Sequence, residues 1–238
     1  GEPDIASEYF EKSLAIEANK INTYELYIFN SLYIKSFDKK KYFELTRKFF
    51  QLIGNRSNNI IKFDKYHKSE KKLKIGLVSG DFKNHPVGYF IEGLLKFLKN
   101  DSSIEILAFS NNSLEDDLTN RVKPFFSEWI SIYSMDDSII INKIKDRKID
   151  ILIDLSGYTL LNKLSVFLKK PAPIQISWAG YLASTGLDEI DYIITDPYVE
   201  SKKNNNQFLE KTYMMPNIWC HFSKPAFDLF ISENIPAL

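Results

Sequence analysis

The sequence has little cysteine, no long apolar run and no excess charge of either sign. Its 238 residues include one cysteine, Cys220, so no disulfide can form within the chain, which is typical of a reducing compartment. Lys plus Arg and Asp plus Glu each number 31, and this balance disfavours nucleic acid as a partner. No run approaches the ~18 apolar residues of a membrane helix, and the first ten residues lack a signal-peptide pattern. These absences predict a cytoplasmic protein without a membrane span.

The motifs of several common chemistries are also missing. The sequence has no GxGxxG dinucleotide fingerprint, no GxxxxGK[ST] phosphate loop, no HExxH, no paired cysteine and histidine spacing for zinc, and no GxSxG elbow. Cys220 is followed by His221, but adjacent residues seldom face each other. A packed thiol is therefore favoured over a cysteine nucleophile.

The first part of the chain has the pattern of helices. Between Ala6 and Gly76 the only glycine or proline is Gly54, and such an unbroken stretch favours helices. Apolar residues recur at helical spacing in ASEYFEKSLAI and again from Tyr24 onwards. A third helix is predicted after Asp38, a suitable N-terminal cap. We predict an all-α segment over residues 1–55.

The character of the sequence changes after a polar and basic stretch, residues 56–72, which we interpret as a linker. Aliphatic runs such as LKIGLVS, IEILAFS and IDILIDL then alternate with helical patterns, and PIQIS and DYIITD continue the series. This alternation is typical of a parallel sheet with crossover helices. The predicted fold class is α/β, with a Rossmann-like sheet over residues 73–238.

Ligands of open parallel sheets bind beyond the carboxyl ends of the strands, so the loops after the strands are the candidate site. The first of these loops holds His85, between Asn84 and Pro86. Its imidazole suits a site group near neutral pH, and it equally suits a cap of the following helix. The residues alone leave both interpretations open.

Two further loops are unusual. Asp154 ends a predicted buried strand and Gly157 permits a sharp turn, so Tyr158 and Thr159 are expected to project into the crevice at the edge of the sheet that holds His85. The alternative is that Asp154 or Ser156 caps the following helix. In the next loop, small residues between two glycines would let the backbone approach a ligand closely, although such loops are usually connections. These small residues are Ala183, Ser184 and Thr185, bracketed by Gly180 and Gly186.

The motifs SGDFKNHPVGYF, DLSGYT, KKPAPIQISWAGYLASTGLDEIDYIITD and YMMP together resemble the amino-terminal catalytic lobe of the O-linked N-acetylglucosamine (O-GlcNAc) transferase family, including its SPINDLY-like members. The resemblance covers about residues 73–216 in consistent order. The segment SEYFEKSLAIEAN is also similar to the closing helix of a tetratricopeptide repeat, and such repeats precede the catalytic region in this family. The resemblance implies the first half of a GT-B fold, in which two Rossmann-like lobes face each other across a cleft.

The resemblance also implies an activity. The family moves a sugar, usually N-acetylglucosamine from UDP-GlcNAc, to serine or threonine hydroxyls of an acceptor protein or peptide, with inversion and without a metal or cofactor. His85 matches the family histidine beside the transferred sugar, a base or positioning group. The residues that match substrate-binding positions are Asp154, Tyr158, Thr159, Ser184, Thr185 and Gly186.

The sequence departs from the family in three ways that bear on function. Most nucleotide contacts of the family, including an essential lysine, belong to a second lobe without a counterpart here, so we expect a fragment that is inactive alone. Leu182 replaces the usual proline of a turn near the sugar, and Tyr158 replaces the histidine of many bacterial members. The alternatives are a fucosyl- or glucosyl-transferring relative, a non-catalytic protein-binding module, or a stand-alone α/β enzyme of another chemistry.

Overall fold

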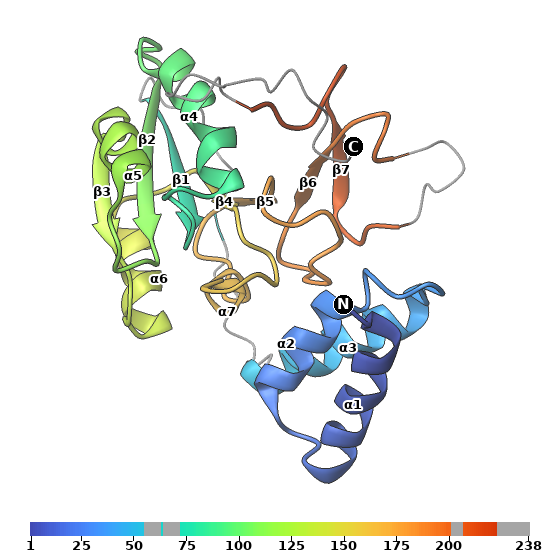
Figure 1. Ribbon diagram of the computed structural model, residues 1–238. Helices are drawn as coiled ribbons and strands as arrows, with labels where there is room; N and C mark the ends of the chain where they lie inside the picture. Colours follow the sequence, from blue (N-terminus) through green and yellow to red (C-terminus); the bar gives the residue numbers. More distant parts are fainter. Residues whose placement is uncertain (55–62, 64–71, 201–206, 223–238) are drawn as a thin grey trace.

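The computed structural model describes residues 1–54, 63, 72–200 and 207–222. Three helices come first, α1 (Pro3–Ile16), α2 (Ile21–Asn30) and α3 (Lys39–Ile53), as the sequence predicts (Figure 1). Asp38 caps α3, because its carboxylate accepts the backbone N–H groups of Lys40 and Lys41. Residues 56–62 and 64–71 of the predicted linker lie outside the described residues.

The rest of the described chain forms a seven-stranded sheet in which every strand pair is parallel, with helices on both faces. The predicted α/β, Rossmann-like class is confirmed. The edge strands β3 and β7 were not predicted because they are mostly exposed and lack an aliphatic run, and the six residues of α5 carry too little periodicity. The elements are β1 (Leu73–Ser79), α4 (Pro86–Leu98), β2 (Ile104–Ser110), α5 (Asp117–Val122), a 3-10 turn (Lys123–Phe125), β3 (Glu128–Ser131), α6 (Asp137–Asp146), β4 (Ile151–Asp154), α7 (Leu164–Phe167), β5 (Ile174–Ser177), β6 (Tyr192–Thr195) and β7 (Lys211–Met214).

The order of the strands creates a switch point in the middle of the sheet. The order is β3-β2-β1-β4-β5-β6-β7, so the chain runs from β1 towards one edge and then returns to add β4 and the later strands on the other side of β1. Val78 of β1 lies in register with Asp154 of β4. The loops that follow β1 and β4 therefore diverge from neighbouring positions, which is the arrangement that opens a crevice in doubly wound sheets.

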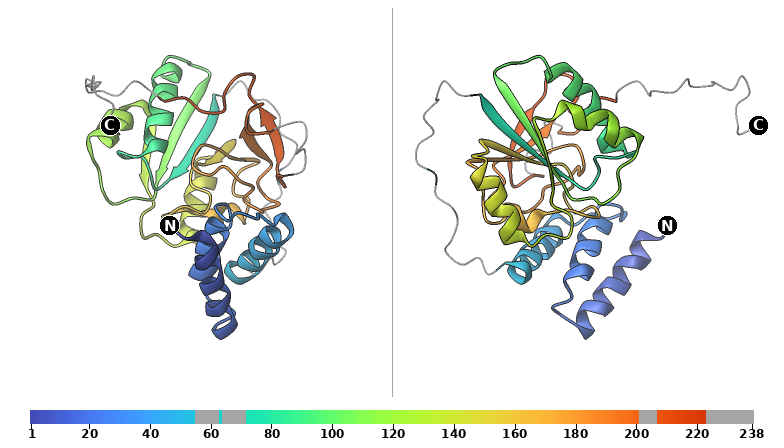
Figure 2. Two further views of the ribbon diagram at one scale, coloured as in Figure 1. Left: turned by 45° about the vertical axis from the view of Figure 1, so that its right-hand side comes forward. Right: turned by 90° about the vertical axis from the view of Figure 1, so that its left-hand side faces the viewer.

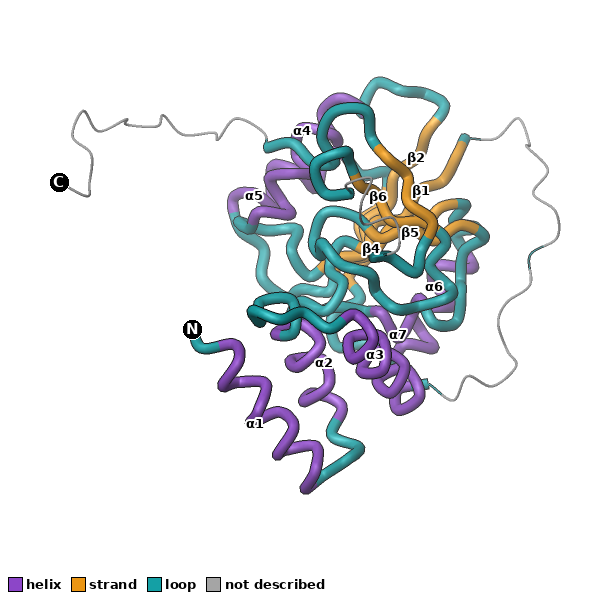
Figure 3. The backbone as a smooth tube through the Cα atoms, turned by 90° about the vertical axis from the view of Figure 1, so that its right-hand side faces the viewer, coloured by secondary structure: helices purple, strands orange, loops and turns teal. Residues whose placement is uncertain are grey.

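The two faces of the sheet carry separate apolar cores. Helices α4 and α5 cover one face, and α6 and α7 cover the other, as the right-hand view of Figure 2 shows. The second core continues into the amino-terminal helices, where Ile28, Phe49 and Phe50 belong to the same buried cluster as Leu152 and Phe167. Figure 3 shows α3 beside α7. The helical segment is thus packed into the lobe through a shared core, although α1 itself buries no residue completely.

Among the described residues, no helix is both long enough and apolar enough to cross a membrane.

Candidate functional site

The candidate site lies at the switch point, on the edge of the sheet where the strands end. We call this edge the rim and define it by the loops after β1 (residues 80–85), β4 (155–163) and β5 (178–182). The backbone N–H of Leu155 donates to the carbonyl of Val78 over 3.0 Å, and the N–H of Trp178 donates to the carbonyl of Asp154 over 2.9 Å. These bonds extend the sheet ladder by one residue and hold the three loops side by side.

His85 lies on the rim and caps α4. Its Nδ1 accepts the backbone N–H of Val87 over 3.3 Å, and Pro86 at the first helical position has no N–H to satisfy. The side chain is 39% exposed, and Nε2 has no hydrogen-bond partner among the described residues. The capping interpretation is therefore correct, and it leaves a site role open because it uses only one ring nitrogen.

Asp154 is buried at the end of β4 and shapes the turn that follows. Its Oδ1 accepts the N–H of Ser156 over 3.1 Å and its Oδ2 accepts the N–H of Gly157 over 2.8 Å. Burial raises the pKa of the Asp154 carboxyl to about 6, although both hydrogen bonds act to lower it. The alternative prediction that Asp154 or Ser156 caps the following helix is wrong, because α7 begins at Leu164 with Lys163 at its N-cap.

The loops after β4 and β5 interlock through glycines. Gly157 has a φ of 56°, and a Cβ there would lie 2.2 Å from the Cβ of Tyr181. A Cβ on Gly180 would lie 1.8 Å from the carbonyl oxygen of Leu155. Only glycine permits these two approaches. Ala179, the residue before Gly180, is buried and has a φ of 65°. This left-handed conformation is strained for alanine, and such strained residues are concentrated at functional sites.

Tyr158 does not project into the crevice, and this part of the prediction is wrong. Its hydroxyl donates to the carbonyl of Thr185 over 2.6 Å. The centroid of its ring lies 5.5 Å from that of Phe49 in α3 and 5.4 Å from that of Tyr181. Burial raises the pKa of Tyr158 well above its usual value. The sequence could not reveal this, because α3 lies more than a hundred residues earlier in the chain.

Thr159 follows Tyr158 and faces a different space from His85. Its hydroxyl donates to the carbonyl of Ser156 over 2.8 Å. Tyr158 and Thr159 both line a cavity of about 540 Å³ between α2 and residues 158–162. Leu161, also in its wall, packs closely against Gly80 of the β1 loop. Thr159 therefore lies near the rim but on the side of the amino-terminal helices.

Ser184 and Thr185 are buried, and Glu210 holds them. The Ser184 hydroxyl donates to Glu210 Oε2 over 2.7 Å, and the Thr185 backbone N–H and hydroxyl both donate to Glu210 Oε1. Tyr42 of α3 shares a hydrogen bond with Tyr181 and donates to the carbonyl of Ser184. Together these residues form what we call the tyrosine seam, namely Tyr42, Tyr158, Tyr181, Ser184, Thr185 and Glu210.

The small-residue turn is thus not an open turn beside His85. Gly186 has a φ of 71° and packs against Thr46 of α3, next to the tyrosine seam. The sequence-based expectation of a close ligand approach at this turn is replaced by a close approach of α3. The structure brings His85 and Asp154 to one switch point and separates them from Ser184, Thr185 and Gly186.

Sequence reasoning missed three residues of the rim. Asp81 has one carboxylate oxygen 3.7 Å from His85 Nδ1, and its position four residues before His85 was the only signal. Ser156 has a buried hydroxyl with no hydrogen-bond partner among the residues that the structure describes, and buried polar groups of this kind are uncommon enough to mark a site. The sequence offered Ser156 only as a candidate helix cap, and it gave no signal for the strained Ala179.

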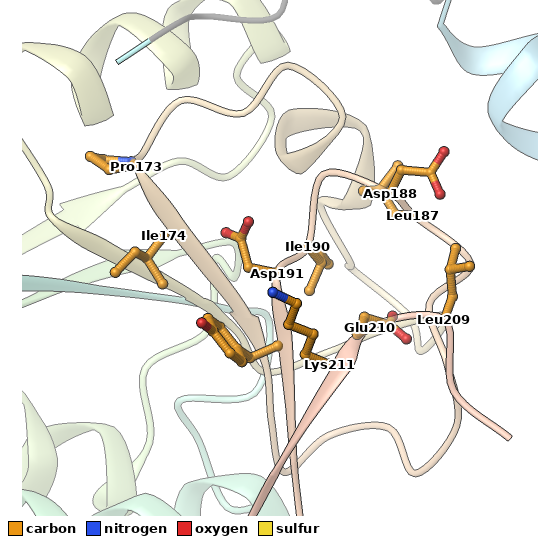
Figure 4. Close-up of a pocket in the computed structure, with 10 residues that line it drawn as sticks. Pro173, Ile174, Leu187, Asp188, Ile190, Asp191, Leu209, Glu210 and Lys211 are labelled. Carbon is orange, nitrogen blue, oxygen red and sulfur yellow. The ribbon is translucent and has the colours of Figure 1, made fainter. Parts of the chain in front are cut away.

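A further cavity of about 370 Å³ lies at the opposite edge, where β5, β6 and β7 begin (Figure 4). Asp188, Asp191 and Lys211 are among its lining residues. Asp191 is already paired, because Lys170 Nζ lies 2.7 Å from its Oδ2. None of the predicted site residues lines this cavity, so the rim remains the candidate site.

Comparisons with known proteins agree on one group of relatives. Residues 46–223 match the family model described as Glycosyl transferase family 41. A protein of Solanum lycopersicum named as a probable UDP-N-acetylglucosamine–peptide N-acetylglucosaminyltransferase, SPINDLY, is 34% identical over 161 residues, which are 66% of this chain and 17% of that protein. A protein of the same name from Oryza sativa subsp. japonica is 31% identical over 222 residues, 90% of this chain and 23% of that protein.

A solved structure is similar in fold. It is a mutant of an O-GlcNAc transferase of Thermobaculum terrenum, with a TM-score of 0.81 and 22% sequence identity. The match covers 92% of this chain and 42% of that chain. The chain therefore spans less than half of the solved relative and about a fifth of the two plant relatives.

Proposed function

The chain belongs to glycosyltransferase family 41, and from that premise we propose that it supplies one wall of a site that transfers N-acetylglucosamine from UDP-GlcNAc to serine or threonine hydroxyls of a protein or peptide. The observation that carries the proposal is the position of His85, half-exposed on the rim at the switch point of the sheet. The names of the SPINDLY relatives support a nucleotide sugar as donor and a peptide as acceptor. The single cysteine supports a cytoplasmic location as part of the same proposal.

In the proposed reaction, His85 takes the proton of the acceptor hydroxyl through Nε2, the ring nitrogen that has no partner among the described residues. The hydroxyl oxygen attacks the anomeric carbon from the side opposite the leaving diphosphate, so the sugar is transferred with inversion and without a metal. The diphosphate requires cationic or amide donors as it leaves. We assign these donors to a second lobe that faces the rim.

The remaining predicted residues act in this proposal mainly by holding the rim. Asp154 fixes the turn after β4, and Ser184, Thr185 and Gly186 anchor the loop after β5 from its buried end. Tyr158 joins these two loops through its hydrogen bond to Thr185. Thr159 remains the predicted substrate-binding residue whose surroundings, beside a cavity, suit contact with the acceptor.

The test is sugar transfer by the full-length natural protein carrying His85→Ala. We expect kcat to fall by ~10²–10⁴-fold, the usual contribution of a general base. His221→Ala is the matched control and is expected to retain wild-type activity, because His221 plays no part in the proposal. Transfer at the wild-type rate by His85→Ala would refute the catalytic role.

The donor and the need for a second lobe are tested separately. UDP-GlcNAc, UDP-glucose and GDP-fucose are offered in parallel, and we expect UDP-GlcNAc to be preferred. Preference for another donor would move the protein to the fucosyl- or glucosyl-transferring relatives, and inactivity with every donor would favour a protein-binding module. The 238-residue chain alone is expected to show no turnover; robust transfer by it would contradict a second lobe.

A further inference from the structure

Two groups compete for the Nδ1 atom of His85. The backbone N–H of Val87 lies 3.3 Å away and needs a lone pair on Nδ1, whereas a carboxylate oxygen of Asp81 lies 3.7 Å away and needs a proton there. A neutral imidazole carries one proton, so these partners select opposite tautomers. When Val87 holds the ring, Nε2 carries the proton and can only donate. When Asp81 holds it, Nε2 presents a lone pair.

The carboxylate of Asp81 lies close to the imidazole of His85 and belongs to the loop that follows β1. Its side chain is 10% exposed, and the Asp81 backbone N–H donates to the hydroxyl of Ser79 over 2.9 Å, which ties the loop to the end of β1. Its second oxygen lies 3.7 Å from the ammonium group of Lys83. Within the described part of the chain, neither carboxylate oxygen accepts a hydrogen bond at normal length. A carboxylate with so little exposure gains from accepting a direct bond.

We propose that Asp81 is the positioning residue that sets the tautomer of His85 for sugar transfer. A shift of the ring by about 1 Å brings Nδ1–H to hydrogen-bonding distance of Asp81 and gives up the long bond from Val87. Nε2 then presents its lone pair to the rim. The Asp81–His85 pair thus has a capping arrangement, seen in the structure, and a base-competent arrangement.

The inference rests on the proposed function, and its chemistry balances as follows. The acceptor O–H bond breaks and its proton goes to Nε2, while the acceptor oxygen bonds to the anomeric carbon. The bond between that carbon and the diphosphate oxygen breaks, and its electron pair leaves with the nucleoside diphosphate. The imidazolium that results keeps its Nδ1–H on Asp81, whose negative charge stabilises it, and releases the Nε2 proton to solvent after transfer.

The tautomer is measured on the 238-residue chain without any assay of activity. The sequence has three histidines, so long-range ¹H–¹⁵N correlation spectra of labelled protein can be assigned to His85 by comparison with His85→Gln. In the neutral ring of the wild type we expect a population with the proton on Nδ1. In Asp81→Asn the amide donates to Nδ1, so we expect the proton on Nε2. A wild-type spectrum with the His85 proton only on Nε2 would overturn the proposal, whether or not Asp81→Asn folds.

The kinetic test uses the full-length protein. Asp81→Asn is expected to lower kcat by ~10²-fold with little change in KM for the acceptor, because the base is lost and binding is retained. In the His85→Ala background the same substitution is expected to have no further effect. An equal fall of kcat in both backgrounds would show that Asp81 acts on structure alone.

Ser79→Ala is the matched control, because it removes the hydrogen bond that ties the Asp81 loop to β1 but keeps the carboxylate. It is expected to retain the wild-type tautomer. If it reproduces the spectrum of Asp81→Asn, loop geometry and not the carboxylate sets the tautomer, and the inference fails. Full activity of His85→Ala would instead refute the proposed function, and it would not change the result of the tautomer measurement.

Discussion

The rim and the tyrosine seam differ in how their polar groups are satisfied. On the rim, the cap of His85 is 3.3 Å long, and Lys83 Nζ and His85 Nδ1 each lie 3.7 Å from a carboxylate oxygen of Asp81. In the seam, Glu210 alone accepts three hydrogen bonds, all of them buried. Short and complete hydrogen bonding in a buried place stabilises the fold, whereas groups left partly satisfied at the surface can serve a substrate. Sequence resemblance marked both regions as one site, and burial separates them.

The largest expected effect on stability is that of Glu210→Ala. The substitution leaves the donors of Ser184 and Thr185 buried without an acceptor. We expect the free energy of unfolding in urea to fall by about 3–5 kcal/mol. Glu115→Ala, which removes an exposed carboxylate paired with Lys123, is the control and is expected to change it by less than about 0.5 kcal/mol. Similar losses of unfolding free energy in the two variants would contradict the conclusion that the buried hydrogen bonds of the tyrosine seam stabilise the fold.

Asp154 sharpens the comparison, because it ends β4 directly before a rim loop and is nevertheless buried. Burial raises its pKa from 3.8 to about 6, so the folded state binds this proton more tightly than the unfolded state. The contribution of this group to stability is therefore present below the unfolded pKa and is lost as the pH rises through about 6, a change of about 3 kcal/mol.

Asp154→Asn tests this pH dependence. The variant has no charge to bury, so its free energy of unfolding relative to the wild type is expected to rise by up to about 3 kcal/mol between pH 4 and pH 8. Urea unfolding at the two pH values measures the difference. A difference that does not change with pH would show that Asp154 is not desolvated in solution.

Tyr42→Phe tests the seam from the side of α3. The change removes one hydroxyl that bonds to Ser184 and Tyr181 and keeps the ring. We expect a loss of about 1–3 kcal/mol in thermal or urea unfolding, because buried partners lose their bond. Tyr198→Phe removes a hydroxyl from a tyrosine that is 84% exposed and is expected to have no measurable effect. No loss in Tyr42→Phe would mean that the helices contribute only apolar packing.

The smallest effect on stability is expected from His85→Ala, on the rim. It removes one long capping bond from a half-exposed side chain, so the free energy of unfolding is expected to fall by only about 0.5–1 kcal/mol. Asp38→Ala, which removes the cap of α3, is the matched comparison and should cost a similar amount. A loss of several kcal/mol in His85→Ala would give the histidine a structural role like that of the seam.

The fold could be predicted largely from local patterns. The aliphatic runs that became β1, β2, β4, β5 and β6 are each bounded by turn residues, and Asp38 marked the start of α3. Strand β7 could not be predicted in the same way, because all four of its side chains are exposed. It owes its place to pairing with β6, which local sequence does not express.

The candidate site was predicted less completely. The placement of His85 after β1 and of Asp154 at the end of the adjacent strand β4 followed from the rule for parallel sheets, and the structure has both there. The burial of Tyr158 and Ser184 did not follow from any local pattern. It depends on α3 and on Glu210, which lie far from these residues in the sequence.

By itself, the sequence determined the α/β class, the order of the main elements and the loop that carries His85, because hydrophobic periodicity and turn residues act over a few neighbouring positions. Only the tertiary structure decided which polar side chains remain at the surface. Tyr42 and Ser184 are 142 residues apart and share a buried hydrogen bond. Such pairing is fixed by the packing of α3 against the sheet loops, and that packing divides one set of motif residues into a rim that can meet a substrate and a seam that cannot.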